Sequence, residues 1–80
     1  MNLKPITTEK AVMLIESQNV LTFETERTAT RIEVKKEVEE LFNVKVEKVS
    51  MMIQGNKKKV YVKLKKNSPA IDVATKLGII

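Results

Sequence analysis

Residues 44–65, VKVEKVSMMIQGNKKKVYVKLK, decide the fold of this 80-residue chain. The apolar residues of the first half change phase, from even positions (44 and 46) to odd positions (49, 51 and 53). Successive side chains of a strand point to opposite faces, so one regular strand cannot place both sets on the same face. We therefore predict a strand that contains a β-bulge or twist near Glu47 and Lys48.

The second half of the stretch predicts the other strand of a hairpin. Residues 54–57 form a short turn, and the following strand, 58–65, is apolar at its even positions. The opposite face carries Lys59, Tyr61, Lys63 and Lys65. Lysines neutralise phosphates and a tyrosine ring can stack on a base or sugar, so this face is a candidate contact with RNA or DNA. Lysine also protects exposed strands from aggregation, which leaves a purely solubilising role open.

The sequence before the hairpin predicts two helices and a strand. Residues 7–17 indicate a threonine-capped helix that ends near Ser17, and residues 20–24 alternate like a half-buried strand. The second helix begins with a capping box formed by Thr30 and Glu33. Its single apolar stripe consists of Val34, Val38, Leu41 and Phe42.

The sequence after the hairpin predicts a final helix. Ser68 is expected to be its N-cap and Pro69 its first residue, while Gly78 suits the left-handed conformation that ends a helix. The order α-β-α-β-β-α predicts an α+β fold, in which a small, mainly antiparallel three-stranded sheet packs against helices. We expect one domain over residues 1–80, with a split β-α-β topology.

Composition excludes several classes of function. The chain has no Cys and no His, and its two glycines cannot build a phosphate-binding loop. The serines at positions 17, 50 and 68 therefore have no histidine to activate them, although a lysine could in principle serve as the base. We predict no enzyme, no metal site and no cofactor. No apolar run approaches the length of a membrane span, so we expect a cytoplasmic protein without membrane insertion. We also expect no small-molecule substrate.

The positive charge is confined to the carboxyl-terminal part of the chain. Residues 1–47 hold 7 basic and 9 acidic side chains, whereas residues 48–80 hold 8 basic and 1 acidic side chain. This asymmetry favours a polyanionic partner, because basic side chains gain affinity by releasing counterions from phosphates.

Several ordered segments closely resemble the family of large-subunit ribosomal protein number twenty-three. The similarity covers nearly the whole chain and rests on residues 8–11, Asn19, and residues 29–36, 38–46, 58–62 and 70–80. The ending, Asp72-Val73-Ala74 followed by Lys76 and Gly78-Ile79-Ile80, resembles the archaeal and eukaryotic branch. The short length, without a basic extension, resembles archaeal members.

The resemblance implies a structural protein that binds large-subunit ribosomal RNA at the rim of the polypeptide exit tunnel. It also implies a docking platform for signal recognition particle and the translocon, beside large-subunit ribosomal protein number twenty-nine. The sequence departs from the family at Ser50-Met51, where members often have Asn-Thr, so the resemblance implies no specific amide contact with RNA there. The hairpin is reduced to residues 54–57, and we therefore do not expect contact with the nascent chain inside the tunnel.

Candidate site residues follow from the basic face and the resemblance together. The resemblance implies a docking carboxylate at Glu9, preceded by Thr8. The predicted RNA-binding residues are Lys10, Arg27, Arg31, Lys35, Lys36, Lys57, Lys58, Lys59, Tyr61, Lys63 and Lys65. The alternative interpretation is a small α+β protein-interaction module with a solubilising lysine-rich face.

Overall fold

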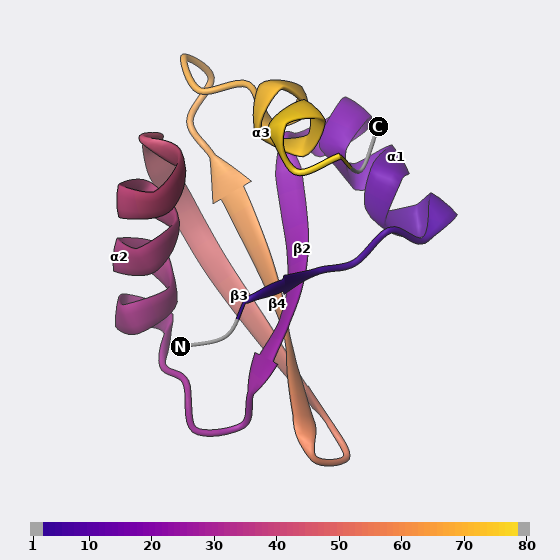
Figure 1. Ribbon diagram of the computed structural model, residues 1–80, viewed down its shortest axis with the longest axis vertical. Helices are drawn as coiled ribbons and strands as arrows, with labels where there is room; N and C mark the ends of the chain where they lie inside the picture. Colours follow the sequence, from indigo (N-terminus) through magenta and orange to yellow (C-terminus); the bar gives the residue numbers. More distant parts are fainter. Residues whose placement is uncertain (1–2, 79–80) are drawn as a thin grey trace.

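The computed structural model describes residues 3–78, in which three helices and four strands follow one another along the chain. The strands are β1 (Lys4–Pro5), β2 (Val20–Glu26), β3 (Val46–Gln54) and β4 (Lys57–Leu64). The helices are α1 (Glu9–Gln18), α2 (Arg31–Phe42) and α3 (Ala70–Lys76). In Figure 1 the β3–β4 hairpin runs to one end of the molecule, while α1 and α3 lie near the other end.

The four strands form one antiparallel sheet in the order β1-β2-β4-β3. Because β4 lies between β2 and β3 and is antiparallel to both, those two strands are parallel and α2 connects them. This arrangement confirms the α+β class and the split β-α-β topology. The expected count of three strands is wrong by one. Strand β1 spans only two residues, too few for a repeating pattern, and pairs Lys4 with Glu24 and Pro5 with Phe23.

The predicted bulge is present at Glu47. Val46 pairs with Leu64 and Lys48 pairs with Lys63, so Glu47 is the extra residue in β3. Beyond it the register is regular, which returns the odd positions of β3 to the face that carries the even positions of β4. The bulge thereby places Val46, Val49 and Met51 against the same core, while Ile53, close to the turn, is 56% exposed.

The main core lies between one face of the sheet and helices α2 and α3. Its largest fully buried side chains are Phe23, Leu21 and Leu64, joined by Val34 and Val38 of α2 and by the small residues of α3. The ring of the half-buried Phe42 stacks on Phe23 with 6.2 Å between the ring centroids. Leu41 is 60% exposed, so its predicted place in the apolar stripe of α2 is wrong.

The predicted helix starts are confirmed at α1 and α2. The Thr8 hydroxyl oxygen accepts from the Ala11 amide at 3.3 Å, and that of Thr30 accepts from the Glu33 amide at the same distance. The capping box is only half formed, because the Glu33 carboxylate accepts from the Thr30 hydroxyl rather than from the backbone. No helix within residues 3–78 combines the length and the apolar character that a membrane span needs.

The start of α3 differs from the prediction. The Ser68 hydroxyl does not cap the helix but accepts from the Lys45 amide at 3.1 Å, and the helix begins at Ala70 rather than Pro69. The side-chain oxygen of Asn19 accepts from the Ala70 amide instead. At the other end, Gly78 has a φ of 75°, as predicted for a left-handed terminator.

Candidate nucleic-acid interface

One face of the sheet carries most of the basic side chains that were predicted on β4. We call it the lysine face; it consists of Lys57, Lys59, Tyr61 and Lys63 of β4 with their same-face neighbours on β2 and β3. Tyr61 lies between Thr22 and Ser50, and Lys63 lies between Val20 and Lys48. The opposite face of the sheet packs on the core. Alternate residues of β4 therefore contribute either to the lysine face or to the core.

Charge is unevenly distributed along the lysine face. Toward the hairpin turn, Lys57 lies opposite Glu26 and Lys59 opposite Glu24. At the other end, Lys63 lies directly opposite Lys48. Like charges at directly paired positions destabilise a sheet, whereas opposite charges stabilise it. The end with the two paired lysines is therefore the more favourable one for an anion, although the exposed carboxylate of the bulge residue Glu47 lies in the hollow next to it.

A groove of about 430 Å³ lies at this end of the lysine face. Helix α1 forms one wall and β3 the other, while the half-buried Tyr61 lies between them. The lining residues are Lys10, Leu14, Gln18, Val20, Lys48, Ser50, Met52, Tyr61 and Lys63. Three of these side chains are cationic and none is acidic, whereas four present apolar or aromatic surface. The groove therefore combines a positive rim with a partly apolar interior.

The structure brings some of the predicted RNA-binding residues together in this groove. Lys10, Tyr61 and Lys63 line it, although they come from two elements far apart in the sequence. Lys57 and Lys59 share the lysine face but lie nearer the hairpin turn, opposite the two glutamates. Lys65 is exposed just beyond the end of β4.

The remaining predicted RNA-binding residues lie elsewhere. Lys58 is on the core side of β4, and its ammonium donates to the Ala29 carbonyl at 2.8 Å. This bond fastens the loop between β2 and α2, which gives Lys58 a structural role. Arg27 is exposed in that loop. The exposed basic residues of α2 are Arg31, Lys35 and Lys36.

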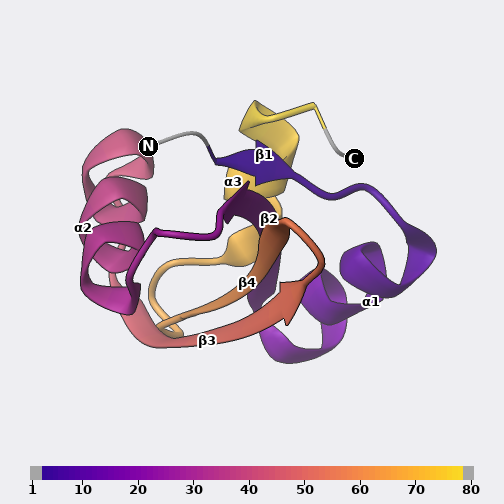
Figure 2. The same cartoon turned by 90° about the horizontal axis from the view of Figure 1, so that it is seen from below.

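Helix α2 packs against the core face of the sheet, through Val34 and Val38. In Figure 2, α2 and α1 lie on opposite sides of the molecule, with the sheet between them. The basic residues of α2 therefore face away from the groove, and the eleven predicted residues do not form one surface.

Lys48, Ser50 and Met52 of β3 also line the groove, but they were not among the predicted site residues. A usable signal was present, because the predicted bulge puts the even positions of β3 on the same face as Tyr61 once the hairpin is paired. Gln18 and Leu14 carried no comparable signal, since their place in the groove depends on how α1 packs against the sheet.

The two predicted docking residues have different surroundings. The Thr8 hydroxyl is used as the cap of α1, whereas Glu9 is exposed in its first turn. Met13, one turn further along, is 65% exposed, and Glu16 is exposed at the next turn. This outward side of α1 is separate from the side that carries Lys10 and Leu14 into the groove.

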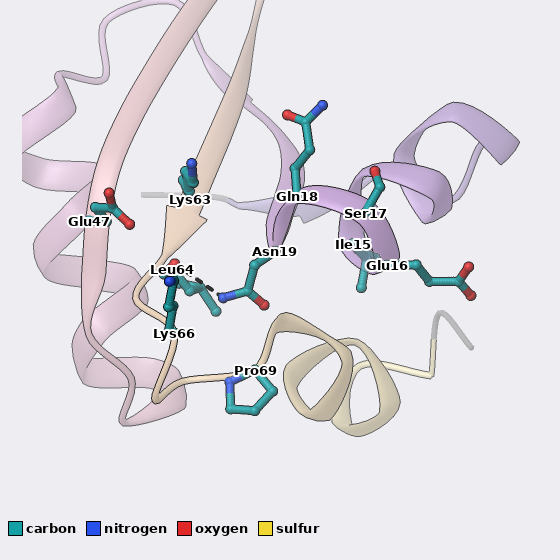
Figure 3. A pocket seen from close by; sticks show the side chains of 10 residues that line it. All are labelled: Ile15, Glu16, Ser17, Gln18, Asn19, Glu47, Lys63, Leu64, Lys66 and Pro69. Atoms are coloured by element: carbon teal, nitrogen blue, oxygen red, sulfur yellow. Dashed lines mark hydrogen bonds between the residues drawn. The ribbon is translucent and has the colours of Figure 1, made fainter.

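A second hollow, of about 570 Å³, lies where α1, β4 and the start of α3 meet (Figure 3). The side-chain nitrogen of Asn19 donates there to the carbonyls of Leu64, Lys65 and Ser68, at 3.1–3.2 Å. Its side-chain oxygen is occupied by the Ala70 amide. The Asn19 amide therefore holds the fold together and offers little to a ligand. Within residues 3–78, no three acidic side chains converge as a metal site.

Comparison with known proteins identifies a family. A family model described as ribosomal protein L23 matches residues 1–71. A protein of Picrophilus torridus described as large ribosomal subunit protein uL23 is 47% identical over 77 residues, which cover 96% of this chain and 94% of that protein.

Proposed function

Since this chain belongs to the ribosomal protein L23 family, we propose that it binds large-subunit ribosomal RNA at the rim of the polypeptide exit tunnel. Membership in the family makes it a structural constituent of the large ribosomal subunit, in the cytoplasm. We further propose that residues 1–80 act as one RNA-binding domain.

The observation that carries this proposal is the lysine pair at the groove. Lys48 and Lys63 are exposed and directly paired across two strands, and they line a groove that has no acidic lining residue, although Glu47 lines the adjoining hollow together with Lys63. Two like charges at paired positions cost folding free energy, and phosphate contacts would offset that cost. A lysine-rich face that served solubility alone would not require this pairing.

The test is the salt dependence of binding to a fragment of large-subunit ribosomal RNA, with an unrelated structured RNA as competitor. We expect affinity to fall by about 0.7–0.9 log units per log unit of salt for each phosphate contact. The double substitution Lys48→Glu and Lys63→Glu should lower affinity by about tenfold or more and flatten the salt slope.

The matched control is the double substitution Lys57→Glu and Lys59→Glu. It makes the same charge change on the same face, but where Glu24 and Glu26 already lie opposite. We expect a smaller loss of affinity from this control. Equal losses from both pairs would remove the groove from the site, and equal binding of both RNAs would leave only a non-specific basic protein. Failure to bind either RNA would favour the protein-interaction module.

A second part of the proposal concerns the outward side of α1. Glu9, Met13 and Glu16 present an exposed methionine between two carboxylates, and this side of α1 does not line the groove. We assign to it the docking of signal recognition particle and the translocon. Large-subunit ribosomal protein number twenty-nine is the proposed neighbour in the subunit.

A further inference from the structure

We propose that the groove between α1 and β3 holds one unpaired nucleotide of the bound RNA, with its base stacked on Tyr61. The flanking phosphates would lie against Lys10, Lys48 and Lys63. This inference rests on the proposed function and adds the form of RNA that the site takes. The occupant is a nucleotide out of its stack, rather than the backbone of a regular duplex.

The dimensions of the groove fit a single small occupant. Its volume, about 430 Å³, is comparable with the roughly 300–1,000 Å³ of small-molecule sites, and the groove is partly open rather than enclosed. Leu14 and Gln18 stand on the helix side, and Ser50 and Met52 stand on the strand side. A base inserted between these walls would lie against Tyr61.

The chemistry of the interior is that of a base-binding site. Phosphate contacts need only the lysines, so the apolar surface of Leu14 and Met52, which is not fully buried, is available to a second part of the ligand. Met52 is 49% exposed, and covering it would remove apolar area from water. Base faces are flat and apolar, whereas a duplex hides them in its stack.

Polar groups are also available for the edge of a base. The Gln18 amide has both donor and acceptor atoms, and the Ser50 hydroxyl can act in either way. Both side chains line the groove, and Ser50 is directly paired with Tyr61. The three lysines would attract either RNA or an acidic peptide. RNA is favoured because its flat base can fill the interior of the groove beside them, and a peptide has no such base.

The chain offers a direct probe of the groove. Tyr61 is its only tyrosine and it contains no tryptophan, so tyrosine fluorescence reports on this position alone. The experiment titrates the full chain with a short oligoadenylate and, separately, with a blunt RNA duplex that has the same number of phosphates. We expect the oligoadenylate to quench the fluorescence and the duplex to bind without quenching it.

The variants Tyr61→Ala and Tyr61→Phe separate stacking from charge. Alanine should weaken oligoadenylate binding by about tenfold, as for the loss of one stacked base, with an unchanged salt slope because the lysines remain. Phenylalanine should retain the affinity. Affinity for both variants is measured by competition, and urea unfolding shows that each variant is folded.

Three outcomes would overturn the inference. One is salt-dependent binding without quenching in the unsubstituted chain, which leaves the proposed function standing. Another is equal quenching by the strand and the duplex. The third is unchanged affinity of the folded Tyr61→Ala variant. If neither the oligoadenylate, the duplex nor the ribosomal RNA fragment binds, the proposed function fails with it.

Discussion

At the scale of single residues, Asn19 connects parts of the chain that are distant in sequence. It ends α1 in the left-handed conformation, with a φ of 59°, and its amide bonds four backbone groups in residues 64–70. Asn43 has nearly the same backbone conformation at the end of α2, with a φ of 53°. The two residues thus allow side-chain bonding to be tested apart from backbone preference.

We predict that Asn19→Gly lowers the free energy of unfolding by about 2 kcal/mol, because several partly buried backbone groups lose their partner. Glycine accepts the left-handed conformation, so the loss reports on the amide alone. Asn43→Gly is the control and should change stability by less than about 0.5 kcal/mol. Urea unfolding of both variants measures the difference, and equal effects would contradict the role assigned to the Asn19 amide.

At the scale of elements, the end of α2 shows how narrow its buried side is. Leu41 and Phe42 are neighbours, yet Phe42 stacks on Phe23 while Leu41 is 60% exposed. We predict that Phe42→Ala lowers the free energy of unfolding by about 3 kcal/mol. Leu41→Ala should alter it by less than about 0.5 kcal/mol. A urea series that gave both variants the same midpoint would disprove this orientation of α2.

Local chemistry made most elements predictable from the sequence. Thr8 and Thr30 cap their helices through contacts only three residues away, so short-range patterns suffice. The phase change around Glu47 revealed the bulge because a buried strand face tolerates no slip. Strand β1 was missed because its pairing with β2 depends on tertiary structure, and Ser68 was misassigned because a distant asparagine took the capping role.

Only part of the candidate site was predictable from the sequence. Strand parity correctly placed Lys59, Tyr61 and Lys63 on one face. The same alternation places Lys58 on the other face. Lys58 was nevertheless predicted to bind RNA, because it lies between Lys57 and Lys59 in the sequence. The wall formed by Leu14 and Gln18 could not be predicted, because no local pattern fixes the packing of α1 on the sheet.

At the scale of the whole molecule, RNA binding and factor docking are assigned to different sides of α1. We predict that the double substitution Glu9→Lys and Glu16→Lys lowers the affinity of signal recognition particle for assembled ribosomes by about tenfold, since it reverses both exposed carboxylates. Affinity for ribosomal RNA should not fall, because the groove residues are untouched. Unchanged factor binding on ribosomes that carry the variant would count against this docking surface.

The central position of β4 also bears on how the chain folds during its own synthesis. Within the sheet, strands β2 and β3 are held side by side only by β4, which follows both of them in the sequence. Three of the four groups that Asn19 bonds, on Lys65, Ser68 and Ala70, follow β4 in turn. A nascent chain that stops short of residue 57 has two strands with nothing between them. Long-range pairing of this kind slows folding. The part of the sheet formed by β2, β4 and β3 therefore cannot assemble until the residues of β4 have been translated.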